Sequence, residues 1–169
     1  LAKLTSGKTD LLLEPVHCGE VLTEVSEALQ PLAAEKHLSL TAQPPGPAVV
    51  LRTNRRYLRQ ILLNLASNAV KYTEAGSVSL SLHCASRDGK SVVHFVVQDT
   101  GIGISPEDKP RLFQEFGRLN PGLGAPSDSA GLGLHLSRKM ASLLDGEITV
   151  DSEPGTGSVF TLILPALPP

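Results

Sequence analysis

The sequence predicts an α+β fold, a two-layer sandwich in which helices cover one face of a mixed, mostly antiparallel sheet. Two stretches, residues 18–35 and 54–72, place apolar side chains at the i, i+3, i+4, i+7 spacing of helices with one buried face. The turn Arg87-Asp88-Gly89-Lys90 separates two apolar runs, a pattern typical of a β-hairpin. Helical and strand-like segments alternate irregularly along the chain, which favours an α+β arrangement.

The first predicted elements lie before residue 52. A short strand is expected over Leu11–Pro15, and a helix then extends from Cys18 to about Glu35. Two strand-like runs follow, Leu38–Ala42 and Ala48–Leu51, and the turn Pro44-Pro45-Gly46-Pro47 separates them.

The central elements are a helix and a hairpin. Asn54 is placed to cap a long helix that ends at about Tyr72. The hairpin strands are expected over Ser77–His83 and Val92–Val97. A serine followed by proline and two acids then predicts a short helix from Ser105 to about Phe116.

The C-terminal part begins with a long loop. Residues 117–130 contain three Gly and two Pro with almost no apolar pattern, which is more typical of a functional lid than of a simple connector. A helix is expected over Leu132–Leu144, followed by a hairpin of Glu147–Asp151 and Ser158–Leu164. The tail Pro165–Pro169 is not expected to continue a central strand.

Composition excludes several classes of protein. The 169 residues carry a net charge of −2 with only 4% aromatic residues, so nucleic-acid binding is not expected. Cys18 and Cys84 lie far apart without a C-x-x-C motif, so neither a disulfide framework nor a zinc site is indicated. No apolar run approaches the about 18 residues of a membrane span, so no direct membrane contact is expected. No signal peptide precedes the domain and the chain begins at Leu1, so we expect a piece of a longer protein.

One helical segment carries an unusual set of polar residues. Asn64, Asn68, Lys71 and Tyr72 lie close to one helix face. Amide oxygens there could hold a hydrated Mg²⁺, while the lysine meets phosphate and the tyrosine lies against a base. A solvent-exposed helix edge would explain the same residues.

Two glycine-containing segments add to this pattern. In Asp99-Thr100-Gly101-Ile102-Gly103 a strand ends in an acid that could accept a hydrogen bond from an adenine amino group, although an ordinary turn has the same pattern. A Rossmann fingerprint is rejected because Pro106 stands at the third glycine position. Gly131-Leu132-Gly133-Leu134 opens a helix, where backbone N–H groups can bind phosphate or the glycines can simply ease helix entry. Ser6-Gly7-Lys8-Thr9 is not a P-loop, since the earlier glycine is missing.

The order of these segments resembles the ATP-binding catalytic domain of sensor histidine kinases, in the GHKL superfamily that also holds gyrase B, MutL and heat-shock chaperones. The match covers nearly the whole chain and passes through RQILLNLASNAVKYT, DTGIGI, RLFQEF, GLGLHLSRKMASLLDG and SEPGTGSVF in the family's order. It implies the α/β sandwich of the Bergerat type, with ATP held between helices and a mobile lid.

The resemblance also implies a role for each matching residue. At the base, Asp99 would take the adenine amino group, Tyr72 would stack nearby, and Ser158 would support the pocket beside Asp99. Gly101 and Gly103 would shape the same pocket.

At the phosphates, Asn68 is the implied Mg²⁺ ligand and Asn64 its partner, while Lys71 contacts phosphate. Asn64 and Lys71 are the implied catalytic residues. Closure of the lid would bring further residues to the phosphates: Arg118, Gly131, Leu132, Gly133 and Leu134. Phe113 and Phe116 would anchor the lid.

The resemblance favours a kinase over a hydrolase. In hydrolysing relatives a glutamate stands four residues before the metal-binding asparagine and activates water, whereas Asn64 stands there and an amide has no useful basicity. Two alternatives remain: a non-catalytic nucleotide-sensing module, which Ser129 in place of the family's usual glycine leaves open, and a GHKL ATPase, which Asn64 disfavours.

The phosphoacceptor is expected to lie elsewhere. A histidine followed by an acid is implied for it, and none of the five histidines has that context. Residues 1–8 are then the end of an upstream dimerisation helix and its linker, residues 9–165 the ATP-binding catalytic domain, and residues 166–169 a tail. The implied partners are Mg²⁺, ATP, the protein's own dimerisation domain and a response regulator receiver domain, for a homodimer acting in the cytoplasm.

Overall fold

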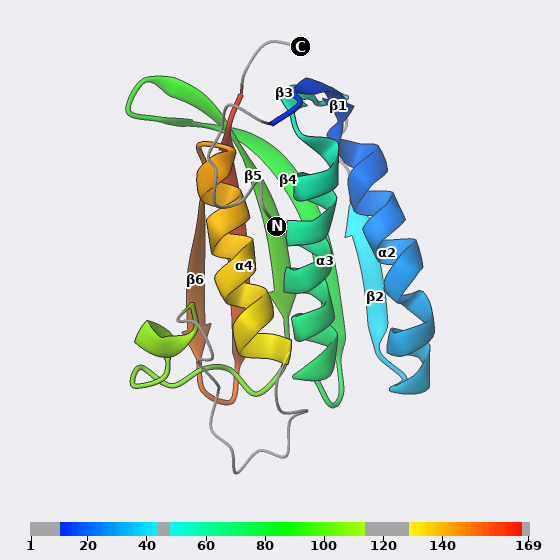
Figure 1. The fold of residues 1–169 in the computed structure, drawn as a ribbon. Coiled ribbons are helices and arrows are strands. Elements are labelled where there is room, and N and C mark those ends of the chain that lie inside the picture. The colour runs from blue at the N-terminus through cyan, green and yellow to red at the C-terminus, as the bar shows by residue number, and fades with distance from the viewer. Residues whose placement is uncertain (1–10, 44–47, 114–128, 167–169) are drawn as a thin grey trace.

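The computed structural model describes residues 11–43, 48–113 and 129–166. Within these residues, three α-helices lie over one face of a five-stranded sheet (Figure 1), as the two-layer α+β prediction requires. The elements in chain order are β1 (Glu14–His17), α2 (Cys18–Glu35), β2 (Ser39–Gln43), β3 (Val50–Thr53), α3 (Arg55–Lys71), β4 (Ser77–Arg87), β5 (Lys90–Asp99), a 3-10 turn (Lys109–Arg111), α4 (Ser129–Leu143), β6 (Glu147–Glu153) and β7 (Gly157–Pro165).

The large sheet is mixed and mostly antiparallel. Its strand order is β2-β4-β5-β7-β6, and only β2 and β4 pair in parallel. The predicted hairpin joins β4 to β5 at Asp88 and Gly89, whose φ angles of 53° and 78° are the positive values that a two-residue type I′ turn needs. Both strands extend to the turn and are longer than predicted, because the polar residues beside it also pair.

The core lies between the helices and the sheet. Period-2 alternation turns one face of β4 and β5 inward, and Leu80 and Phe95 there are fully buried. The predicted stripe of α3 packs onto this face, since Leu58, Ile61 and Leu65 are buried as well.

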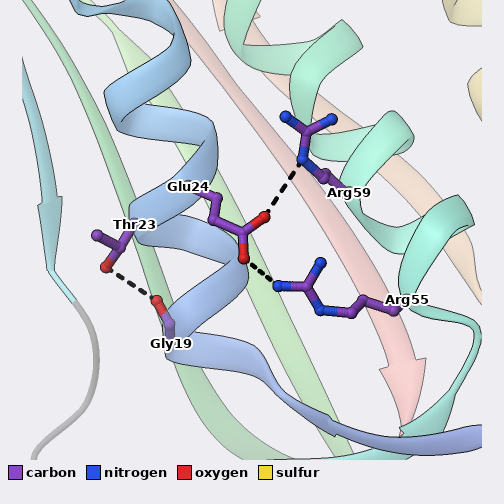
Figure 2. A network of polar contacts seen from close by, with 5 residues as sticks. All are labelled: Gly19, Thr23, Glu24, Arg55 and Arg59. Carbon is purple, nitrogen blue, oxygen red and sulfur yellow. Dashed lines mark hydrogen bonds and ion pairs between the residues drawn. The ribbon is translucent and has the colours of Figure 1, made fainter.

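Two ion pairs join α2 to α3 on the outer side of the helical layer (Figure 2). The Glu24 carboxylate contacts the guanidinium of Arg55 and lies 3.4 Å from Nε of Arg59. The hydrogen bond from Arg55 is the main reason that the pKa of Glu24 lies below its ordinary value. Because all three side chains are exposed to solvent by more than a third, these pairs add little to stability.

Strand β1 differs from the prediction. It begins at Glu14, not at Leu11, and pairs antiparallel with β3 in a separate two-stranded sheet, so β2 and β3 are not neighbours. Pro15 is accommodated there because β1 is an edge strand, in which not every backbone N–H has to donate to a neighbouring strand. At the other end of the chain, β7 extends through Pro165, which pairs with Val92, so the expectation that Pro165 would not continue a central strand is wrong.

The predicted helix from Ser105 is wrong over the residues described. Ser105 Oγ accepts a hydrogen bond from the Asp108 backbone N–H at 3.3 Å, but the chain then forms only turns and the 3-10 turn. Pro110 explains this result, because a proline four residues after Pro106 supplies no N–H for a continuing α-helix. Residues 114–116, the rest of that predicted helix, lie outside the described part of the chain.

Helix α4 starts at Ser129, three residues before the prediction, and ends at Leu143. The predicted stop holds, because Asp145 adopts a φ of 61° and the Gly146 N–H donates to the Ala141 carbonyl at 2.8 Å. The predicted lid falls on residues 117–128, outside the described residues, apart from its last two positions in α4.

Candidate functional site

Both ends of α3 are fixed by side-chain hydrogen bonds. Asn54 Oδ1 accepts from the Tyr57 backbone N–H at 2.9 Å, so the predicted cap is confirmed. At the opposite end, Lys36 Nζ donates to the carbonyls of Val70 and Lys71 at 2.7 and 2.9 Å. A cation at the C-terminus satisfies carbonyls that would lack helical partners and complements the helix dipole.

A pocket of about 360 Å³, including the space open to solvent at its mouth, lies beside this end of α3. It is bordered by the end of β5, the loop after it, the β6–β7 hairpin and α4. Four of the predicted site residues supply its polar lining: Asn68, Tyr72, Asp99 and Ser158. The rest of the lining is apolar or glycine: Ala69, Ile102, Gly103, Ile104, Leu112, Leu134 and Phe160. An apolar slot with a few polar groups in its lining suits a flat heterocyclic ligand.

Asp99 is the charged group of this pocket and is only 7% exposed. Its Oδ1 accepts hydrogen bonds from the backbone N–H groups of Gly101 at 2.8 Å and Ser158 at 3.3 Å. Burial raises the pKa of Asp99 above its ordinary value, and these two backbone bonds oppose the rise. The result is a partly desolvated hydrogen-bond acceptor facing the cavity.

Two buried serines lie next to Asp99 on the closing hairpin. Ser152 and Ser158 face each other across β6 and β7, with their hydroxyl oxygens 2.8 Å apart. Ser152 Oγ also accepts from the Ile104 N–H at 2.8 Å and donates to the Gly157 carbonyl at 2.9 Å. The hairpin is thereby joined to the loop that follows β5.

The loop after β5 contains Gly101 and Gly103, and at both positions the backbone lies too close to other parts of the protein for a side chain to fit. A Cβ on Gly101 would lie 2.4 Å from the Tyr72 carbonyl oxygen, and a Cβ on Gly103 would lie 2.0 Å from the Glu153 carbonyl oxygen. Gly103 also has a φ of 74°, which side-chain-bearing residues rarely adopt. The loop therefore packs directly between the end of α3 and the hairpin.

Asn64 lies one helical turn before Asn68 and faces α4. Its Nδ2 donates to the Gly133 carbonyl at 3.3 Å and to Ser137 Oγ at 2.9 Å. Its Oδ1 accepts from Gln60 Nε2 at 2.9 Å. In this structure Asn64 therefore joins α3 to the first turns of α4.

Phe113 packs between the sheet and α4. Its ring meets Phe160 edge to face with centroids 6.5 Å apart, and the Arg138 guanidinium carbon lies 5.4 Å from the ring centroid. His135 Nδ1 lies 3.2 Å from the Phe113 carbonyl oxygen. Residues of α4 thus contact the segment that precedes the undescribed stretch.

The other predicted site residues are placed as follows. Lys71 ends α3 and is not part of the pocket lining. Gly131 belongs to the first turn of α4, as does Leu132, while Arg118 and Phe116 lie outside the described residues. Sequence reasoning missed Ser137 and Ser152, because nothing in the local pattern distinguishes them from other serines. The inward position of Phe160 could have been found from the alternation along β7.

Two absences concern only the part of the chain that the structure describes. Its His, Cys, Asp and Glu residues form no group of three or more that could hold a metal ion. None of its helices combines the length and apolar character that a membrane crossing requires.

Comparison with known proteins identifies relatives of this fold and site. Residues 53–168 match the family model described as histidine kinase-, DNA gyrase B-, and HSP90-like ATPase. The sensor histidine kinase RcsC of Salmonella typhimurium is 38% identical over 148 residues, which is 86% of this chain and 15% of RcsC. The aerobic respiration control sensor protein ArcB of Escherichia coli is 36% identical over 167 residues, 97% of this chain and 21% of ArcB. The chain thus spans well under a third of these curated relatives.

Solved structures of histidine kinases have a similar fold. The crystal structure of full-length ShkA in complex with AMPPNP superposes with a TM-score of 0.84 at 34% identity, over 99% of this chain and 34% of ShkA. A nucleotide-free catalytic domain of histidine kinase ThkA has a TM-score of 0.75 at 21% identity, over 94% of this chain and all of that domain, which is evidence for the fold alone.

Proposed function

Because the chain belongs to the family of histidine kinase-, DNA gyrase B- and HSP90-like ATPases, we propose that its full-length protein autophosphorylates a histidine and passes the phosphate to a response regulator. The chain itself is the catalytic ATP-binding domain of a sensor histidine kinase in two-component signalling. The proposed partners are a dimerisation domain that carries the histidine, within a homodimer, and a receiver domain, all acting in the cytoplasm.

The base of ATP is assigned to the end of the pocket that Asp99 occupies. This assignment carries the proposal, because a buried carboxylate with one oxygen already fixed by two backbone donors is suited to accept the amino group of adenine. Tyr72 and Gly103 line the same slot, and the apolar residues around them suit the ring faces.

Mg²⁺ is assigned to Asn68. Asn68 is 8% exposed and borders the pocket one turn before Tyr72, and its side chain makes no hydrogen bond to another described residue. An amide oxygen suits Mg²⁺, which keeps several waters and takes its other ligands from phosphates. Such an ion would neutralise charge on the phosphates during transfer. The remaining residues proposed for the phosphate end are Asn64, Lys71, Arg118, Gly131, Leu132, Gly133 and Leu134.

The surroundings of Asn64 support transfer to a histidine over hydrolysis. An activated water needs a nearby base, and the side chain at this position is an amide whose oxygen already accepts from Gln60 and whose nitrogen donates to α4. Nothing at this position would take a proton from water. The γ-phosphate is thus left for a nucleophile from another domain.

Binding of a fluorescent ATP analogue to the chain, titrated with and without Mg²⁺, tests this function. We expect Asn68→Ala to weaken Mg²⁺-dependent binding by about tenfold or more, the effect of losing one contact to a charged group. Gln98→Ala, which removes an exposed amide next to Asp99, is the matched control and should bind normally. Equal affinities of the Asn68→Ala variant and the wild type at all Mg²⁺ concentrations would contradict the metal assignment. Steady hydrolysis of ATP by the chain alone would contradict the kinase.

A further inference from the structure

Ser152 is a buried residue of the hairpin that lies behind the pocket and does not line it. It is 7% exposed and takes part in three hydrogen bonds, with the Ile104 N–H, the Gly157 carbonyl and the Ser158 hydroxyl. All of its polar capacity is used, because a hydroxyl has one proton to donate and two lone pairs to accept with.

The direction of these bonds follows from counting protons. Ser152 donates its single proton to the Gly157 carbonyl and accepts the Ile104 N–H. The proton in the remaining bond, between the two hydroxyls, must therefore come from Ser158. Ser158 does line the pocket, so its proton points away from a bound ligand and its lone pairs stay available.

The polar end of the pocket consequently presents acceptors. Asp99 offers its carboxylate, and the backbone N–H groups of Gly101 and Ser158 are already engaged with that carboxylate. The Ser158 hydroxyl adds a second acceptor. A base with an exocyclic amino group, or a water bound to it, meets both acceptors favourably, whereas a 6-oxo base would bring a third acceptor against them.

We propose that Ser152 is a positioning residue for base specificity: by fixing the Ser158 hydroxyl as an acceptor, it makes the pocket favour 6-amino over 6-oxo purine nucleotides. The inference rests on the proposed ATP-binding function and refines it. Without Ser152 the Ser158 hydroxyl rotates freely and can donate to a 6-oxo group, so the site loses discrimination rather than binding as such.

Calorimetric titration of the whole chain with Mg²⁺-ATP and Mg²⁺-ITP tests this inference. ITP carries the 6-oxo group in place of the amino group and shares the ribose and triphosphate. We expect Ser152→Ala to reduce the ratio of ATP to ITP affinity by about fivefold, the effect of one hydrogen bond between neutral groups. Ser152→Thr, which keeps a hydroxyl, should restore the ratio, and Ser86→Ala, at an exposed serine of β4, is the matched control.

A double substitution separates positioning from structural support. If Ser152 acts through Ser158, Ser152→Ala should change the ratio in the wild type and leave it unchanged in a Ser158→Ala background. If Ser152→Ala instead lowers the affinities for both nucleotides by the same factor, Ser152 only supports the fold and the inference is wrong. If thermal denaturation shows that the Ser152→Ala variant does not fold, Ser152→Cys takes its place. A reduced ratio of ATP to ITP affinity is then expected, because a thiol is a weaker hydrogen-bond partner than a hydroxyl.

The proposed function and the role of Ser152 are tested by different results. If the wild type binds neither nucleotide, the proposed function and this inference are both overturned. If it binds ATP and Ser152→Ala leaves the ratio at the wild-type value, only the inference is overturned.

Discussion

Asn64 of α3 donates a hydrogen bond to the buried hydroxyl of Ser137 of α4, with the nitrogen and oxygen 2.9 Å apart. The same amide nitrogen donates to the Gly133 carbonyl. The residue that the sequence places beside the phosphates therefore also holds the helix that follows the predicted lid. Any movement of α4 relative to α3 would have to break or exchange these bonds.

Ser137→Ala should reduce stability through this contact. One buried hydrogen bond between neutral groups contributes about 1 kcal/mol, so the free energy of unfolding in urea should fall by about that amount. Ser142→Ala is the control, since Ser142 is exposed on the same helix and both changes gain the same alanine helix propensity. Equal stabilities of the two variants would show that the Asn64–Ser137 contact contributes nothing.

Gly103 and Gly155 form a matched pair for testing the packing of the loop after β5. Their φ angles are 74° and 80°, but a Cβ on Gly103 would overlap the backbone of Glu153, whereas a Cβ on Gly155 would have no atom within 4 Å. Gly155→Ala should cost about 1–2 kcal/mol of backbone strain. Gly103→Ala should cost about 3 kcal/mol or more, because overpacking adds to the strain. Thermal or urea denaturation of both variants measures the difference, and similar losses would contradict the close approach.

Lys36 connects the end of α2 with the nucleotide-binding helix. Lys36→Met keeps the aliphatic stem but removes the charge and both bonds to the C-terminal carbonyls of α3. We expect a loss of about 1–2 kcal/mol in unfolding free energy. ATP affinity should also weaken, since Tyr72 follows directly on this end. Lys90→Met, at an exposed position beside the β4–β5 turn, should change neither quantity.

The buried carboxylate of Asp99 should cost stability. Its folded-state pKa is raised above the ordinary value by desolvation, so the folded protein binds this proton more tightly than the unfolded chain does. The contribution of Asp99 to the free energy of unfolding therefore falls as pH rises from the ordinary pKa of the unfolded chain to the raised pKa of the folded protein. Above the raised pKa the loss is complete.

Asp99→Asn removes this titration and keeps an oxygen for the backbone donors of Gly101 and Ser158. Urea unfolding at several pH values should show a variant at least as stable as the wild type at neutral pH. Its advantage should shrink as pH falls through the raised pKa of Asp99. An advantage that grows on acidification would contradict the sign.

Local signals predicted much of the fold. Asn54 caps α3 because a side-chain oxygen next to an apolar periodic run is sufficient for that task, and Asp88-Gly89 forms its turn because both residues tolerate positive φ. Asp99 falls at the end of a buried strand, as its sequence predicts.

Contacts between segments far apart in the sequence could not be predicted from local sequence patterns. The pairing of β1 with β3 depends on which distant strands meet, and periodicity does not encode that choice. The failed helix at Ser105 shows a capping signal overruled by Pro110 five residues later. Ser152 became visible as a candidate only through its distances to Ile104 and Ser158.

We assign to Asp99 the recognition of the adenine of ATP in this pocket. Isothermal titration of Mg²⁺-ATP into the wild type and into Asp99→Asn tests it most directly, with Asp151→Asn, an exposed carboxylate on β6, as the control. We expect the wild type and the control to bind, and the Asp99 variant, although folded, to lose about 30-fold or more in affinity, as for a hydrogen bond to a charged group. Wild-type affinity in a folded Asp99→Asn variant would contradict this role of Asp99.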